Sequence, residues 1–139
     1  MFYKRVLTIQ DISCIGQCSM TVAPPILSAC QLETCILPSA VLSSHTGGFQ
    51  KPHVRDLSGD MPLIAQKWKQ EGIFFDAVYT GYLGSIQQID FVKSLLPSAI
   101  GPIPVHPVPV QAACLTGEPI VPFVTFIFKL APAFNNVLA

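Results

Sequence analysis

Short apolar runs alternate with segments of helical periodicity along the first 96 residues of the chain. The runs at 5–10, 34–37 and 77–80 are rich in aliphatic and β-branched residues, which predicts three strands. Because helix-like segments separate these strands, the pattern predicts an α/β fold with a mainly parallel sheet.

The first two helix-like segments are bounded by proline and glycine. The first starts at about residue 19, and Pro24 and Pro25 must kink or restart it. The second spans 60–71, where Met, Ile and Trp recur at helical spacing before Gly72 ends the pattern.

The third helix-like segment follows Ser85, which is a candidate N-cap. Its predicted apolar stripe consists of Ile86, Ile89, Val92 and Leu96, and its predicted solvent face of Gln87, Asp90 and Lys93. The sequence therefore predicts that this stripe covers the sheet.

Three loops that follow the apolar runs carry most of the candidate chemistry. They lie at 10–16, 43–51 and 79–85 and are rich in Gly, Ser, Thr and His. Ligands of open α/β sheets bind beyond the carboxyl ends of the strands, so these loops are the predicted ligand site.

Charge and hydropathy narrow the function classes. Lys and Arg total 8, Asp and Glu total 8, and neither sign forms a block, which argues against a nucleic-acid partner. The N-terminal apolar stretch is too short for a signal peptide, and the apolar run at 120–128 is too short for a membrane helix. We therefore expect a cytoplasmic protein with no membrane partner.

The five cysteines do not predict a metal site. Cys14, Cys18, Cys30, Cys35 and Cys114 lack paired CxxC spacing. Cys14 and Cys18 could meet on a helix, but we expect the cysteines to be small buried residues.

The composition changes near Pro97. Of the 16 charged residues, only Glu118 and Lys129 lie in the last 43 positions, whereas eight of the 13 prolines lie there. Prolines at this density oppose helix interiors and central strands, so sparse regular structure is expected. We predict two regions, 1–96 and a Pro-rich apolar tail at 97–139.

The three loops together resemble those of the pyridoxal/pyridoxamine kinases, which belong to the ribokinase-like superfamily. The resemblance covers residues 4–96 and rests on Ile9-Gln10-Asp11-Ile12-Ser13-Cys14-Ile15-Gly16, Ser43-Ser44-His45-Thr46-Gly47-Gly48-Phe49 and Thr80-Gly81-Tyr82-Leu83-Gly84-Ser85. It implies a three-layer α/β/α sandwich, here incomplete.

This resemblance implies ATP-dependent phosphorylation of the 5′-hydroxymethyl group of a B6 vitamer, with ATP and Mg²⁺ as co-substrates. Family members commonly dimerise, so a homodimer is also implied. Which vitamer is preferred stays open at this point.

Four residues are carried over as substrate-binding candidates. Asp11 stands where many members have a Ser that contacts the ring, and its carboxylate could accept a hydrogen bond from the 3-hydroxyl or a protonated ring nitrogen. The alternative is that Asp11 caps the following helix.

Thr46 and Gly47 match the second substrate loop, with an ordinary turn as the alternative. His45 beside them could donate a proton or only form structural hydrogen bonds. Tyr82 matches the residue that packs against the substrate ring, and core packing is its alternative.

The sequence departs from the family beyond residue 96. The family's Asp-Pro-Val, which serves the nucleotide and Mg²⁺ end of the site, is replaced by Val105-His106-Pro107-Val108, and its Gly-x-Gly-Asp motif with the catalytic base has no counterpart. We therefore expect a catalytically incomplete N-terminal part of such a kinase, altered after about Pro97 by a frameshift or a gene-prediction error.

Two alternatives accompany the B6-vitamer kinase interpretation. One is a non-catalytic module that binds a small molecule. The other is a kinase for the hydroxymethylpyrimidine of thiamine synthesis, against which the Gly81-Tyr82-Leu83-Gly84-Ser85 run argues.

Overall fold

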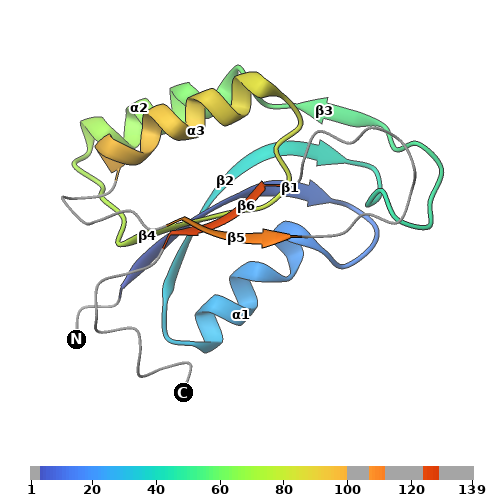
Figure 1. Ribbon diagram of the computed structural model, residues 1–139, viewed down its shortest axis with the longest axis horizontal. Coiled ribbons are helices and arrows are strands. Elements are labelled where there is room, and N and C mark those ends of the chain that lie inside the picture. Colours follow the sequence, from blue (N-terminus) through green and yellow to red (C-terminus); the bar gives the residue numbers. More distant parts are fainter. Residues whose placement is uncertain (1–3, 100–106, 112–123, 129–139) are drawn as a thin grey trace.

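The computed structural model describes residues 4–99, 107–111 and 124–128, and these form one sheet with helices on both faces (Figure 1). The strands, in the spatial order β3-β2-β1-β4-β6-β5, are β1 (Arg5–Ser13), β2 (Glu33–Leu42), β3 (Val54–Asp56), β4 (Ala77–Thr80), β5 (Pro107–Gln111) and β6 (Val124–Phe128). The helices are the 3₁₀ turn η1 (Ser19–Thr21), α1 (Ala23–Ala29), α2 (Asp60–Gln70) and α3 (Ile86–Ala99).

The centre of the sheet is parallel, as the alternating pattern predicted. β1 pairs in parallel with β2 on one side and with β4 on the other. The pairings of β3 with β2, of β6 with β4 and of β5 with β6 are antiparallel, so the whole sheet is mixed.

Apolar residues of the central strands alternate between two cores. Leu7, Ile9 and Val78 face the layer formed by α2 and α3, where Met61 and Val92 join the same buried cluster. The other face holds a smaller cluster, made of Val6, Leu32 and Ala77 with the half-buried Leu27 of α1 against it. Figure 1 shows α2 and α3 above the sheet and α1 below it, which is the expected three-layer α/β/α sandwich.

The predicted strands agree with the observed ones best where they are short. The predicted strand 77–80 is β4 itself, whereas β1 extends to Ser13 and β2 extends through Pro38 to Leu42. At Pro38, β2 pairs with β1 but not with β3, because the pairing with β3 starts at Ala40. A proline is tolerated at such a position, where one side of the strand has no partner.

The predicted apolar stripe of α3 is confirmed for Val92, which is buried, and for Leu96, which packs against the main core, but it is wrong for Ile86. Ile86 is 71% exposed, and the residues that are buried on this helix are Gln88, Val92, Leu95 and Ala99. The predicted solvent positions Gln87, Asp90 and Lys93 are exposed. The departure is therefore confined to the start of the helix, where the buried residue is the polar Gln88 instead of Ile86.

Prolines near the change in composition occupy tolerated positions in the described structure. Pro97 lies inside the last turn of α3, and the predicted division at 96/97 falls within this helix. Pro107 and Pro109 lie in β5, the edge strand next to β6, where a missing backbone donor costs least. His106 lies outside the described residues.

The prediction that the cysteines are buried is wrong for Cys14 and Cys30 and is met only in part by Cys18 and Cys35. Cys14 and Cys30 are exposed, Cys18 and Cys35 are half-buried, and all four are free thiols. Cys14 and Cys18 lie in the turn after β1 and Cys30 ends α1, so only Cys35 sits in a strand, where burial raises its thiol pKa. Cys114 lies outside the described residues.

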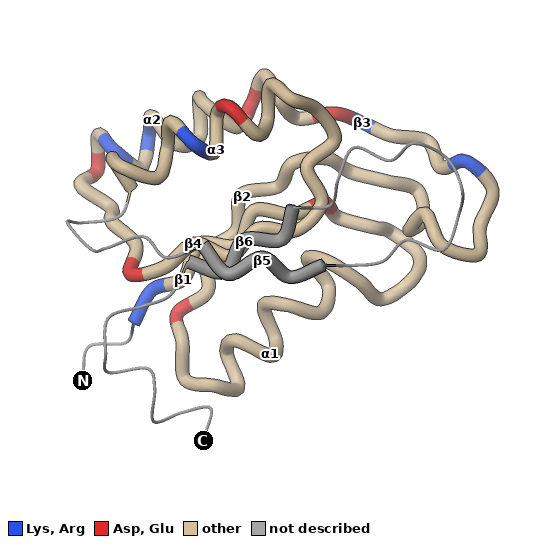
Figure 2. The backbone as a smooth tube through the Cα atoms, in the orientation of Figure 1, with Lys and Arg blue, Asp and Glu red and all other residues tan. Residues whose placement is uncertain are grey.

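Charges are dispersed over the described backbone, and both basic and acidic positions occur along α2 and α3 (Figure 2). Within residues 4–99, 107–111 and 124–128, no helix has the length and apolarity needed to span a membrane.

Asp76 fastens the start of β4 to the start of β1. Its carboxylate accepts hydrogen bonds from Lys4 Nζ and from the Arg5 backbone N–H, each at 2.8 Å. The Asp76 N–H in turn donates to the Arg5 carbonyl at 2.8 Å. Partial burial raises the pKa of this carboxyl, but the two hydrogen bonds and the charges of Lys4 and Arg5 outweigh burial, so the net pKa is lowered.

We predict that Asp76→Asn lowers the free energy of unfolding by about 1 kcal/mol near neutral pH, because an amide cannot accept both bonds. A lowered folded-state pKa stabilises the fold above the ordinary carboxyl pKa, and this contribution disappears as pH falls through the lowered value. Urea unfolding of both proteins between neutral pH and pH of about 3 checks this. The difference should shrink on acidification, and a constant difference would contradict the assignment.

Candidate functional site

Three loops lie at one edge of the sheet because β1, β2 and β4 run in the same direction (Figure 1). They follow the carboxyl ends of these strands, at the right of the view, where the segments after β1, β2 and β4 all turn back. The placement agrees with the position of ligand sites in open α/β sheets.

Asp11 lies inside β1 and is 3% exposed. The Ser13 hydroxyl donates to Asp11 Oδ2 at 2.8 Å, which fixes the orientation of the carboxylate. The first helical turn after β1 begins at Ser19, so the alternative that Asp11 caps that helix does not describe its position. Asp11 is therefore a buried, oriented hydrogen-bond acceptor at the end of the central strand.

Tyr82 lies in the loop between β4 and α3 and is half-buried. The Ser39 hydroxyl of β2 donates to the Tyr82 carbonyl at 2.8 Å. Burial, followed by the negative charges of Asp11 and Asp56, raises the pKa of the Tyr82 phenol. Two predicted site residues, Asp11 and Tyr82, are thus close enough to interact electrostatically.

Thr46 and Gly47 lie exposed in the loop after β2, next to the half-buried His45. His45 joins this loop to the first loop, because its N–H donates to the Ile15 carbonyl at 2.9 Å. Its ring Nδ1 accepts a hydrogen bond from the Gly47 N–H at 2.9 Å. His45 therefore has the structural hydrogen-bonding role that sequence analysis left open.

The His45 ring also explains a glycine in the first loop. Gly16 has φ of +89°, and a Cβ there would overlap His45 Cδ2. On another side, the His45 ring meets Phe49 edge to face with the centroids 5.0 Å apart. The first two loops are therefore fitted to each other through one imidazole.

Sequence analysis missed two buried glutamines at this edge. Gln10 is 3% exposed and packs against Gly81, where a Cβ would lie 2.8 Å from Gln10 Cγ. Its Nε2 has no hydrogen-bond partner in the described structure. Gln88 is 1% exposed and binds four groups. Gln10 falls within the predicted loop 10–16, which gave it no role of its own, and Gln88 is marked only by its interruption of an apolar pattern.

The described residues contain no cluster of metal ligands for the Mg²⁺ that the resemblance implies. Within residues 4–99, 107–111 and 124–128, no group of three or more His, Cys, Asp or Glu side chains could hold a metal ion. We therefore derive no chemical step through a metal or a nucleotide.

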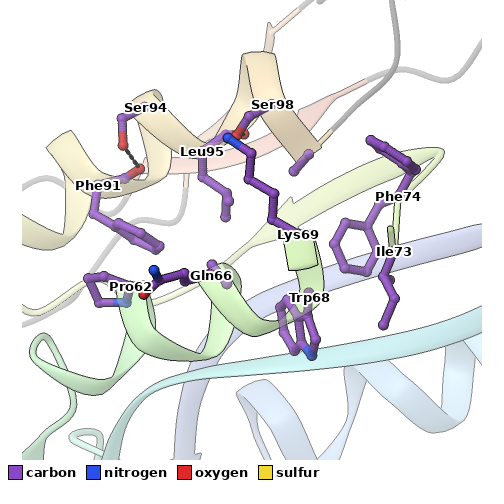
Figure 3. A pocket seen from close by; sticks show the side chains of 13 residues that line it. Pro62, Gln66, Trp68, Lys69, Ile73, Phe74, Phe91, Ser94, Leu95 and Ser98 are labelled. Atoms are coloured by element: carbon purple, nitrogen blue, oxygen red, sulfur yellow. Dashed lines mark hydrogen bonds between the residues drawn. The ribbon is translucent and has the colours of Figure 1, made fainter. Parts of the chain in front are cut away.

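A cavity of about 200 Å³ lies between α2 and α3, away from the three loops (Figure 3). Trp68, Phe75, Phe91 and Leu95 contribute to its apolar lining. None of the four predicted site residues lines it, so it does not belong to the candidate site.

No known family signature and no curated protein sequence matches the chain. Solved structures do. A Bacteroides thetaiotaomicron protein assigned as a phosphomethylpyrimidine kinase, in a crystal form with pyridoxal, is 40% identical with a TM-score of 0.69. The match covers 73% of this chain and 35% of that protein.

Pyridoxal kinase from Lactobacillus plantarum is 33% identical with a TM-score of 0.64, over 67% of this chain and 34% of that enzyme. This chain matches the N-terminal part of the ribokinase-like vitamin kinases. Pyridoxal kinase from Leishmania donovani, solved with ADP and ginkgotoxin, is 23% identical and supports the fold alone, with a TM-score of 0.60 over 67% of this chain and 32% of that enzyme. The chain therefore spans about a third of the length of these ribokinase-like kinases.

Gly16→Ala is predicted to disrupt the contact between the first two loops. Gly48 is the matched control, because it has a similar φ of +78° but nothing within 4 Å of an added Cβ. We expect Gly16→Ala to cost about 2 kcal/mol more than Gly48→Ala, since only the former displaces the His45 ring. Chemical denaturation of both variants measures this difference, and equal losses would contradict the proposed fit.

The electrostatic interaction between Asp11 and Tyr82 can be tested without a ligand. Asp11→Asn removes a negative charge near the phenol and should lower the Tyr82 pKa toward its ordinary value of about 10. Tyrosinate absorbance, with the Tyr82→Phe titration subtracted, measures this shift. Asp90→Asn on exposed α3 is the control, and an unchanged Tyr82 pKa in Asp11→Asn would show that the two groups do not interact.

Proposed function

We propose that this chain carries the substrate-binding loops of a B6-vitamer kinase and binds a vitamer at the edge formed by 10–16, 43–51 and 80–85. One observation carries the proposal. A structure that is 40% identical to the chain was crystallised with pyridoxal, and the chain has loops at the edge of the sheet where ligands of such folds bind.

Asp11 would bind the polar edge of the vitamer ring. Ser13 already donates to Oδ2, so the carboxylate is oriented before a ligand arrives. A buried carboxylate pairs best with a charged or strongly polar donor, here the ring 3-hydroxyl or a protonated ring nitrogen. The aldehyde oxygen of pyridoxal is not a hydrogen-bond donor. Asp11 would therefore recognise the ring that all B6 vitamers share, and it would not distinguish pyridoxal from the others.

Tyr82, Thr46 and Gly47 would complete the contact with the ring. The half-buried phenol of Tyr82 offers an aromatic surface, and its raised pKa shows that it lies within range of the Asp11 charge. The exposed Thr46 hydroxyl and the Gly47 backbone lie on a loop that His45 holds against the first loop. These groups bind and orient an acceptor alcohol, and phosphoryl transfer to it would also need groups around the phosphate.

A pyrimidine substrate is the second candidate. The Bacteroides relative is assigned as a phosphomethylpyrimidine kinase, and Asp11 would also accept a hydrogen bond from an aminopyrimidine. The cytoplasmic location and the homodimer that the resemblance implies stay predictions.

Calorimetric titration of the purified chain tests the proposal. Pyridoxine is the first ligand, since it lacks the aldehyde that forms imines with lysines, and pyridoxamine and hydroxymethylpyrimidine follow. We expect Asp11→Asn and Thr46→Ala each to weaken vitamer binding about tenfold, which corresponds to one lost polar contact. Asp90→Asn, on the exposed face of α3, should bind as the unmodified chain does.

Three outcomes separate the candidates. Tighter binding of hydroxymethylpyrimidine than of any vitamer would favour the pyrimidine kinase, and absence of binding to all ligands would overturn the proposal. A coupled assay with Mg²⁺ and ATP is run in parallel. Turnover that Thr46→Ala abolishes would show that residues beyond the three loops supply a phosphate-donor site.

A further inference from the structure

Gln88 is the exception on the buried face of α3. It is 1% exposed, whereas the other buried residues of this helix are Val92, Leu95 and Ala99. Burying an amide costs free energy unless hydrogen bonds replace those it made with water. The position therefore requires an explanation in terms of the groups that Gln88 binds.

The side-chain amide of Gln88 forms hydrogen bonds with three segments of the chain, through both its oxygen and its nitrogen. Its Oε1 accepts from the Gly84 N–H at 2.8 Å, in the loop that carries Tyr82. Its Nε2 donates to the Ser39 carbonyl of β2 at 2.9 Å and to Ser58 Oγ at 3.0 Å, with Asp56 Oδ2 at 3.4 Å. One side chain thus ties the β4–α3 loop to β2 and to the segment that follows β2.

A bulge in the sheet makes the Ser39 carbonyl available. Gln10 pairs with Pro38 and Ile12 with Val41, so β2 has one extra residue between these pairs. The Ser39 carbonyl accepts from the Leu57 N–H at 3.1 Å as well as from Gln88. Ser39 then uses its hydroxyl to hold the Tyr82 carbonyl at 2.8 Å.

Tyr82 is consequently held at two points of its loop. The Ser39 hydroxyl binds the Tyr82 carbonyl, and the Gln88 side chain binds the backbone N–H of Gly84, two residues later. The phenol itself lies over Gly84, where a Cβ would be 3.2 Å from Tyr82 Oη. A change in the Gly84 backbone would therefore move the surface that the phenol rests on.

We propose that Gln88 is a positioning residue of the ligand site: it fixes the Tyr82 loop against β2 and so sets how tightly the site binds its ligand. The effect on ligand affinity rests on the proposed function, whereas the effect of Gln88 on the Tyr82 loop can be measured without a ligand. This inference assigns a function to a residue that touches no ligand and that acts through Tyr82.

The test replaces Gln88 with Met, which is similar in volume and lacks the amide. Gln87→Met is the matched control, because it makes the same change at the adjacent, exposed position. Hydrogen exchange followed by NMR should show the Gly84 amide exchanging at least about tenfold faster in Gln88→Met, since its acceptor is gone. Pyridoxine affinity should fall about tenfold, and Gln87→Met should change neither quantity.

A double-mutant cycle with Tyr82→Ala separates positioning from a general loss of stability. If Gln88 acts through Tyr82, Gln88→Met adds little further loss of affinity once Tyr82 is gone. Additive losses, or unchanged Gly84 exchange, would overturn the inference. If Gln88→Met does not fold, Gln88→Leu replaces it in the exchange measurement and in the cycle, because it also removes the side-chain amide that binds Gly84 and Ser39.

The two proposals fail in different ways. If the unmodified chain binds no vitamer and no pyrimidine, the proposed function is wrong, and Gly84 exchange in Gln88→Met alone decides whether Gln88 fixes the loop. If the chain binds pyridoxine but Gln88→Met binds it equally well, the proposed function stands and the positioning role is wrong.

Discussion

Strands that lie side by side in the same direction end at the same edge of a sheet, and the candidate site depends on this constraint. β1 pairs in parallel with both β2 and β4, so the loops after the three strands must meet although 67 positions separate the end of β1 from the end of β4. The apolar residues of β1 enforce the pairing, because Leu7 and Ile9 are fully buried under α2 and α3. Register slippage by one residue would turn them to the opposite face.

Sequence periodicity predicts the elements well where one physical effect dominates. The strand at 77–80 and the helix that begins at Asp60 are found as predicted. Burial of apolar side chains determines the strand, and the Asp-Met-Pro sequence determines where the helix begins. The predicted stripe on α3 is wrong at Ile86 only, because apolar periodicity gives no weight to a polar side chain. Gln88 is buried near the start of this helix instead, since four groups form hydrogen bonds with its side chain.

The site was predictable at the level of loops but not of contacts. Glycines and hydroxyl-bearing residues after apolar runs identify 10–16, 43–51 and 79–85, and the parallel order places them together. The bulge opposite Gln10 and the fit of Gly16 to the His45 ring depend on tertiary packing, and no local pattern encodes them. The assignments of Asp11, Thr46, Gly47 and Tyr82 to a ligand remain predictions, although the structure brings Asp11 and Tyr82 into electrostatic contact.

The described loops bear on substrate binding more than on acceleration of the reaction. Contacts from Asp11 and Tyr82 to a vitamer ring would be nearly the same before and during phosphoryl transfer, because the ring does not react. Such uniform binding raises affinity but does not lower the chemical barrier. The barrier falls through charges and donors around the transferring phosphoryl group. In the proposed site, Asp11 and Tyr82 would therefore contribute by orienting the acceptor alcohol. Rigid positioning of Tyr82 through Ser39 and Gln88 is consistent with that contribution, since orientation is lost when the loop moves.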